Sequence, residues 1–153
     1  MELALVGPFF FFMIMFILTI ALDLYAQVLL DDSVRNAVRQ VQNGAITSGG
    51  AFKTAVCNEF GFISNSCQNS LQYDVQGAAT FAAITPATLN ADGTLSSAAN
   101  FSGIAATGNG APVFVLAQVA FLVPFKFINI ANGIVTQNGT PSLYSTNAVA
   151  MEF

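Results

Sequence analysis

The sequence predicts an α+β protein in which one long N-terminal helix packs on a small antiparallel sheet. Two observations predict this class. Residues 2–43 carry an apolar and then a one-sided helical pattern with no terminator between Pro8 and Asn43, and the stretches 71–76 and 113–123 alternate with a period of two. Helices first and strands afterwards are typical of α+β folds. We expect an apolar stem over residues 1–24 and a head over residues 25–153.

The stem is the most apolar part of the chain. Leu3 to Leu22 carries no charge, and Thr19 is its only polar side chain. About 20 apolar residues cross the hydrocarbon core of a bilayer as a helix. A cleaved secretory signal is the alternative, but it would have a basic start, a shorter apolar stretch and a small-residue cleavage site. Asp23 and Leu24 continue the helical register instead, so we expect a retained transmembrane segment.

The same helix should continue into the head over residues 25–43, where apolar residues recur at intervals of three and four. Asn43-Gly44 is a good C-terminal stop, which gives one helix about 60 Å long. Pro8 removes one backbone donor and should bend or locally melt the first turns.

A short second helix is predicted over residues 51–60, with Ser48 as a possible cap and Gly61 as its terminator. Cys57 lies on this helix, and Cys67 lies in a polar stretch, 64–70, that we expect to be a loop. The spacing of the two cysteines is not a metal pattern. On a chain that leaves the cytoplasm, the simplest reading is a disulfide, and a free buried thiol pair is the alternative.

The sheet is expected within residues 70–153. Leu71, Tyr73 and Val75 form the apolar face of a first strand. Residues 113–123 are apolar on both faces, which predicts a central strand covered on one side by the long helix and on the other by a neighbouring subunit. Asn132-Gly133 and Asn138-Gly139 mark turns, and residues 143–153 alternate as a last strand. Residues 77–112 should form short strands and long loops. We expect this region to face outward or toward another subunit, and a surface insertion that tolerates change is the alternative.

Composition excludes several functions. Only 8% of residues are charged and the net charge is -4, so there is no basic surface for nucleic acid. The chain has no His and two Cys, and its acidic residues are scattered without a nucleophile motif or a phosphate loop. We therefore expect no enzyme activity, no catalytic residues, no metal and no cofactor. A head with so little charge is more easily explained if copies of itself cover it.

Several segments resemble one known family. They are the start Glu2-Leu-Ala-Leu-Val-Gly-Pro8, Leu24-Tyr-Ala-Gln27, Phe52-Lys-Thr-Ala-Val-Cys57 with its partner Cys67, Leu71-Gln-Tyr-Asp-Val75, residues 113–124, and Ala148-Val-Ala-Met-Glu-Phe153. In this order and spacing they resemble the TadE-like proteins, pseudopilins of the tight-adherence (Tad) branch of type IV pili.

The resemblance implies a pilin-like fold and a precursor that is held in the bacterial inner membrane, cut by a prepilin peptidase and handled by pilus assembly machinery. The subunit would then join copies of itself in a helical filament at the cell surface. Glu2 would correspond to the family's N-terminal glutamate, although the family usually has four residues before it and here only Met1 precedes it. Either the sequence is trimmed or processing differs.

The residues expected to carry assembly are Glu2, Pro8, Phe9, Phe10, Phe11, Phe12 and Phe16. A carboxylate costs several kcal/mol in hydrocarbon unless it is paired, and the α-amino group of a neighbouring chain is a fitting partner for Glu2. The alternatives are that Glu2 lies unpaired in the headgroup layer and that the Phe run is an inert anchor. A minor or priming pseudopilin, and a membrane-anchored binding head, are the other functions that this sequence allows.

Overall fold

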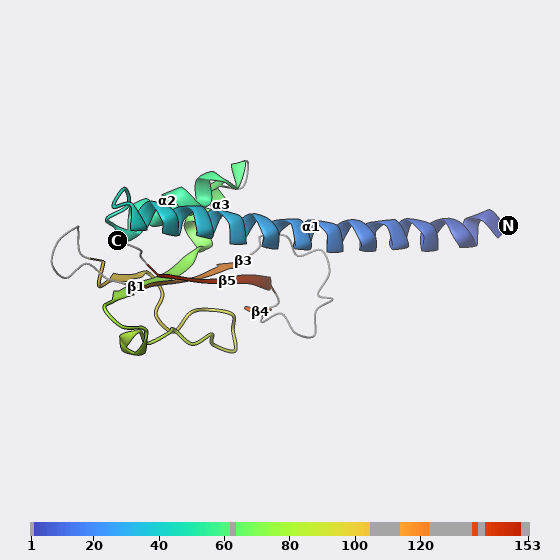
Figure 1. The fold of residues 1–153 in the computed structure, drawn as a ribbon. Coiled ribbons are helices and arrows are strands. Elements are labelled where there is room, and N and C mark those ends of the chain that lie inside the picture. The colour runs from blue at the N-terminus through green and yellow to red at the C-terminus, as the bar shows by residue number, and fades with distance from the viewer. Residues whose placement is uncertain (1, 62–63, 105–113, 123–135, 138–139, 151–153) are drawn as a thin grey trace.

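The computed structural model describes residues 2–61, 64–104, 114–122, 136–137 and 140–150. One long helix, α1, runs the length of the molecule, and the rest of the described chain gathers around its C-terminal half (Figure 1). The predicted α+β class is confirmed. The expected turns at residues 132–133 and 138–139 and the last three residues of the expected final strand lie outside the described part.

Helix α1 spans Glu2–Gln42 and ends where the sequence predicted. Gly44 has a φ of +71°, its N–H donates to the carbonyl of Val41 at 3.0 Å, and the N–H of Ala45 donates to the carbonyl of Gln40 at 2.9 Å. These two bonds form a Schellman motif, which satisfies carbonyls that the helix end leaves open.

The expected local melting at Pro8 was wrong, because the helix is continuous across this residue. Pro8 lies close to the helix start, where its missing N–H deprives the helix of only one hydrogen bond. The rest of the helix therefore propagates from it without interruption.

Two short helices, α2 (Gly49–Asn58) and α3 (Ser64–Ser70), follow α1. Helix α2 starts two residues earlier than predicted because the Ser48 hydroxyl accepts a hydrogen bond from the N–H of Ala51 at 3.3 Å and caps it. The polar stretch 64–70, expected to be a loop, is helical instead. A disulfide joins Cys57 on α2 to Cys67 on α3, with a Cα–Cα distance of 5.6 Å, and this crosslink fixes the short polar helix against the core.

The strands of the described chain are β1 (Gln72–Ala78), β2 (Asn100–Ser102), β3 (Phe114–Leu122), β4 (Thr136–Gln137) and β5 (Thr140–Ala150). They lie in the order β2-β1-β3-β5-β4. The predicted central strand is confirmed, since β3 pairs antiparallel with both β1 and β5. The expectation of a purely antiparallel sheet was wrong, because β2 pairs parallel with β1 after a crossover that residues 79–99 provide.

One face of the sheet packs on the second half of α1. Leu30, Val34, Val38 and Val41 of the helix are fully or almost fully buried in the same core as alternate residues of the strands and the apolar side of α2. The strand residues of this core are Tyr73, Val75, Val115, Ala117, Val119, Phe121 and Leu143, and Leu71 precedes β1 directly. Such a core fixes the orientation of α1 relative to the sheet.

The other face of the sheet is covered by the chain's own residues 79–99, which lie on the side away from α1 (Figure 1). Glutamines on this face hold that segment by its main chain. Gln72 accepts from the N–H of Leu95 at 2.7 Å, Gln118 accepts from the N–H of Ala87 at 2.7 Å, and Gln76 donates to the carbonyl of Thr85 at 2.9 Å. A neighbouring subunit is therefore not needed as the second cover that the sequence predicted.

Asp74 lies in the middle of this second face and is only 1% exposed. Its carboxyl oxygens accept hydrogen bonds from the side-chain amides of Asn100 at 2.7 Å and Gln76 at 2.8 Å. Burial of such a polar group is tolerated only when partners satisfy it. Asp74 thereby joins β1 to the edge strand β2 by side chains as well as by the main chain.

Candidate assembly surface

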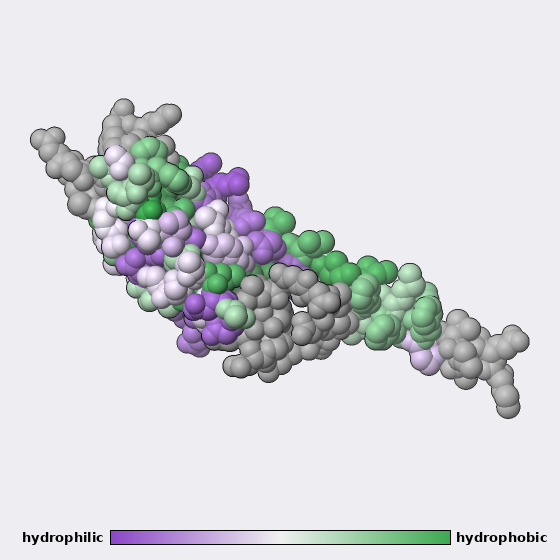
Figure 2. Space-filling view, turned by 90° about the horizontal axis from the view of Figure 1, so that it is seen from below, coloured by the Kyte–Doolittle hydropathy of each residue, from purple (hydrophilic) through white to green (hydrophobic). Residues whose placement is uncertain are grey.

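The N-terminal half of α1 projects from the head without covering from the described residues. Its large apolar side chains are exposed along its length, from Phe9 (72%) to Leu22 (65%), with Ile14 the least exposed of those that stand out (37%). Figure 2 shows the coloured part of this half as a mostly hydrophobic rod leaving a head of mixed polarity. Single exposed apolar residues are normal on a soluble protein, but a continuous surface of this kind indicates a binding surface or a membrane segment.

The structure places the predicted assembly residues as follows. Pro8, Phe9, Phe10, Phe11 and Phe12 are exposed on α1, and Phe16 is partly exposed one turn further on. Phe10 and Phe11 contact each other edge to face, with ring centroids 6.5 Å apart. Glu2 is part of the helix, but its side chain lies outside what the structure describes. These residues share one helix, so the structure does not gather them into a pocket.

The stem satisfies its own polar groups. The hydroxyl of Thr19 donates to the carbonyl of Met15 at 2.7 Å, four residues earlier on the helix. Backbone and side chain therefore need no water along this stretch, which is the condition for a helix in hydrocarbon. By length and composition α1 has a segment able to cross a membrane, and no residue of that segment is buried within the described structure.

The exposed apolar surface does not stop at residue 24, the expected end of the stem. Leu24, Tyr25 and Val28 are all strongly exposed, and Leu30 is the first residue of α1 that is fully buried. The sequence spacing could have predicted this exposure, because Tyr25 and Val28 lie on the side of α1 opposite Leu30 and Val34. The exposed apolar surface is therefore longer than the stem that was expected over residues 1–24.

Gln27 fixes the point at which α1 leaves the head. Its side-chain amide donates to the carbonyl of Tyr144 on β5 at 3.1 Å and lies 3.3 Å from Asp31 on its own helix. The sequence showed Gln27 only as part of a motif and gave no contact for it. The bond attaches the helix to the sheet beside the exposed surface.

A groove of about 290 Å³ lies on α1 at this junction. The residues that line it are Tyr25, Val28, Leu29, Asp31, Asp32 and Arg35. It combines an apolar wall with carboxylates and one guanidinium group, and sequence reasoning did not predict it. Such a lining suits a long side chain that is apolar along its length and charged at its end.

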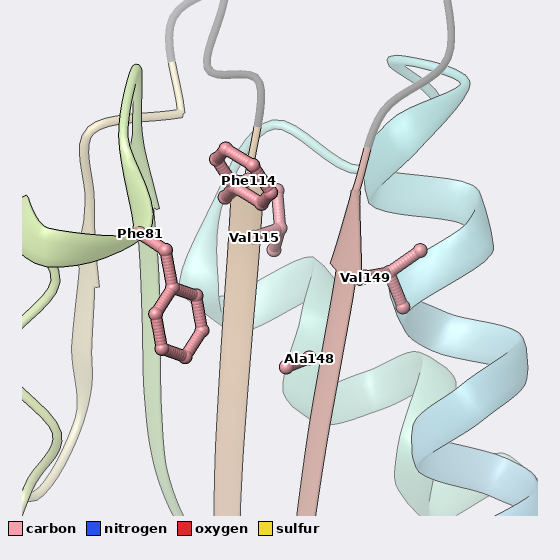
Figure 3. Close-up of a pocket in the computed structure, with 5 residues that line it drawn as sticks. All are labelled: Phe81, Phe114, Val115, Ala148 and Val149. Atoms are coloured by element: carbon pink, nitrogen blue, oxygen red, sulfur yellow. The ribbon is translucent and has the colours of Figure 1, made fainter.

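A second, smaller pocket of about 200 Å³ lies at the far end of the sheet. Phe81, Phe114, Val115, Ala148 and Val149 line it, and Figure 3 shows Phe81 and Phe114 approaching it from neighbouring segments. The two rings stand edge to face with centroids 6.2 Å apart. All five lining side chains are apolar, so they provide neither a nucleophile nor an acid or base.

Among the described residues there is no group of three or more His, Cys, Asp or Glu side chains that could hold a metal ion. The acidic residues of the head beyond α1 that the structure describes do not converge either, and Glu152 lies outside the described residues. Asp74 is buried within its amide network, whereas Asp92 and Glu59 lie exposed on other segments.

The architecture is a long apolar N-terminal helix whose second half supports a small α+β head. Residues 1–39 match the model of the family described as TadE-like protein. The match covers the stem and most of the rest of α1, and it confirms the resemblance that the N-terminal motifs predicted. No curated protein and no solved structure matches the chain. A Tad-pilus-associated, pilin-like protein anchored by its N-terminal helix fits both the family and the fold.

Proposed function

We propose that this protein is the structural subunit of an extracellular pilus-like filament. It is inserted in the inner membrane before assembly and polymerises through its apolar N-terminal helix. The observation that carries the proposal is the continuous exposed surface of α1 from Phe9 to Val28, attached to a head through a shared core. The family match to residues 1–39 supports it, because the match falls on this helix.

Removal from the membrane requires a replacement for lipid. About 25 cal/mol is gained for each Å² of apolar surface kept from water, so a stem with this many bare aromatic and aliphatic side chains cannot stay exposed. Stems of other copies are the fitting replacement. Contacts of this head-to-tail type do not close into a ring in general and produce a helical filament.

The stem offers large side chains for this packing. The stem carries four consecutive Phe residues, followed by the bulky run from Met13 to Phe16. Side chains of this size keep two helix backbones apart, so stems should pack by interdigitating their side chains and not by a close backbone crossing. The filament core is therefore a bundle of stems in which bulky side chains fill the space between helices.

Glu2 is proposed to act at assembly and not at insertion. Its carboxylate would be neutralised in the filament core by the α-amino group of a neighbouring copy, helped by the positive end of α1. Glu2→Ala should leave the amount of membrane-inserted protein unchanged and reduce filaments by at least about tenfold. Glu59→Ala, at an exposed position beside α2, is the matched control. Normal filament yield with Glu2→Ala would contradict the pairing role.

The partners in this proposal are copies of the chain, the inner membrane before assembly, a prepilin peptidase and the pilus assembly machinery. The test is electron microscopy of material sheared from intact cells, with mass spectrometry to identify its main protein and its mature N-terminus. Filaments in which this chain is the main protein are the expected result.

A minor or priming pseudopilin is the second candidate, and the family match favours it, since TadE-like proteins are usually given that role. It predicts filaments that depend on this chain but contain few copies of it. A chain that stays in the membrane while filament formation is unaffected would contradict both roles and favour an anchored binding head.

A further inference from the structure

Four exposed charged residues lie on α1 directly after the apolar surface. They are Asp31, Asp32, Arg35 and Arg39, whose side chains are exposed, whereas Leu30, Val34 and Val38 are buried in the core. At about 100° per residue, Val28, Arg35 and Arg39 fall on one line along the helix, with Asp32 beside it, and Asp31 lies about 60° from Val28 on the side of Val38. The charged residues therefore continue the exposed surface of the stem, with the acidic pair nearer to the stem.

These charges are not paired within the described chain. Asp31 and Arg35 are four residues apart, a spacing at which acid and base often pair on one helix. Among the described residues, these four side chains form no ion pair. Asp31 accepts a hydrogen bond from the side-chain amide of Gln27 at 3.3 Å, and Asp32, Arg35 and Arg39 make no polar side-chain contact within the described chain. Their charges are therefore available to a neighbouring molecule.

We propose that this charged surface sets the axial offset between neighbouring copies, with Asp31 and Asp32 of one copy against Arg35 and Arg39 of the next. The inference rests on the proposed function, because stems that share a direction are what a filament provides. With parallel helices and no offset, acid faces acid and base faces base, which is repulsive. The centres of the two pairs are about 5.5 residues apart, so an offset of about 8 Å brings opposite charges together.

The groove at the junction fits this occupant. Its apolar wall, formed by Tyr25, Val28 and Leu29, suits the methylene stem of an arginine, and Asp31 and Asp32 suit the guanidinium group at its end. A second copy displaced by about 8 Å along the axis presents Arg35 and Arg39 on either side of Asp31 and Asp32, with Arg35 at the level of Leu29. Each copy then contacts one neighbour through its acidic pair and another neighbour through its basic pair, so the contact repeats along the filament.

The experiment uses the full chain in cells and two double variants. Asp31→Lys with Asp32→Lys makes the surface wholly positive, and Arg35→Glu with Arg39→Glu makes it wholly negative. Each alone should lose filaments by on the order of tenfold or more, because every contact becomes repulsive. Expressed together they should recover filaments that contain both in equal amounts, since each then finds opposite charge in its neighbour. Glu59→Lys, an exposed charge reversal outside this surface, is the control and should assemble normally.

The outcomes separate the two ideas. Wild-type chains that never form or enter filaments contradict the proposed function itself. Wild-type filaments together with normal assembly of either double variant alone overturn the charge pairing and leave the proposed function intact. Failure of the mixture, with both variants folded in the membrane and their disulfide formed, also overturns it. In filaments of the wild type, an offset between contacting α1 helices far from about 8 Å overturns the assigned register.

Discussion

Removal of the Asp74 carboxyl group should destabilise the head although Asp74 is far from the stem. In Asp74→Ala the amide of Asn100 loses the acceptor that it has in the structure, whereas Gln76 keeps the carbonyl of Thr85. A buried donor without an acceptor costs about 1 to 3 kcal/mol, and Asn100 and Gln76 are partly buried, so each costs less than a fully buried donor. We expect a loss of about 1 to 3 kcal/mol in the free energy of unfolding.

The isosteric change Asp74→Asn separates the hydrogen bonds from the shape of the side chain. Asparagine keeps one carbonyl oxygen but turns an NH₂ group toward another amide donor, so about half of that loss should remain. Asp92→Asn is the matched control. Asp92 is exposed in the same covering segment, and hydrogen bonds from the hydroxyl and N–H of Thr94 hold the pKa of its carboxyl group below the ordinary value. Its replacement should change stability by less than about 0.5 kcal/mol.

The assay is urea unfolding of the full chain in detergent micelles. Tyrosine fluorescence reports on the head, because the chain has no Trp and Tyr73 lies in the core beside Phe52 at a ring-centroid distance of 5.9 Å. Proteolysis within residues 79–104 should become faster in Asp74→Ala, since this segment loses part of its attachment. A loss no larger than that of Asp92→Asn would refute the reasoning that the polar network holds the second face.

The remaining predictions concern the crosslink and a close contact in the backbone. Cys57→Ser should lower the free energy of unfolding by about 2 to 3 kcal/mol on the chain-entropy estimate. Reductant should destabilise the wild type but not the variant. Equal melting temperatures of the wild type and the variant, each with and without reductant, would mean that the disulfide adds no stability. Gly103→Ala should loosen β2, because Gly103 has a φ of +71° and an added Cβ would collide with the carbonyl oxygen of Gly77. Gly44→Ala is the control, because Gly44 has the same φ of +71° but open space around it. It should lower the free energy of unfolding by about 1 kcal/mol. A loss of only this size in Gly103→Ala would show that β2 can move aside.

The helices and the central strand could be predicted from local pattern alone. The stem is apolar on all sides, the supporting half of α1 is apolar on one side, and Asn43-Gly44 stops it, so each signal lies within a few residues of the feature that it determines. The double-sided apolar run at 114–122 likewise required a central strand, since only burial on both faces explains it. Two errors came from reading polarity as exposure or irregularity: α3 was expected to be a loop, and the second cover of the sheet was assigned to another subunit.

The sequence by itself predicted the apolar helical stem and the α+β head, and it shows that only 8% of residues are charged. Only the tertiary structure decided that Asp74 and three glutamines form the attachment of residues 79–104, that β2 runs parallel to β1, and that the four charges on α1 lie unpaired beside the stem. The physical reason is distance along the chain. Periodicity reports which side of one element is buried, whereas these features depend on partners many residues away whose approach is set by the packing of the whole head.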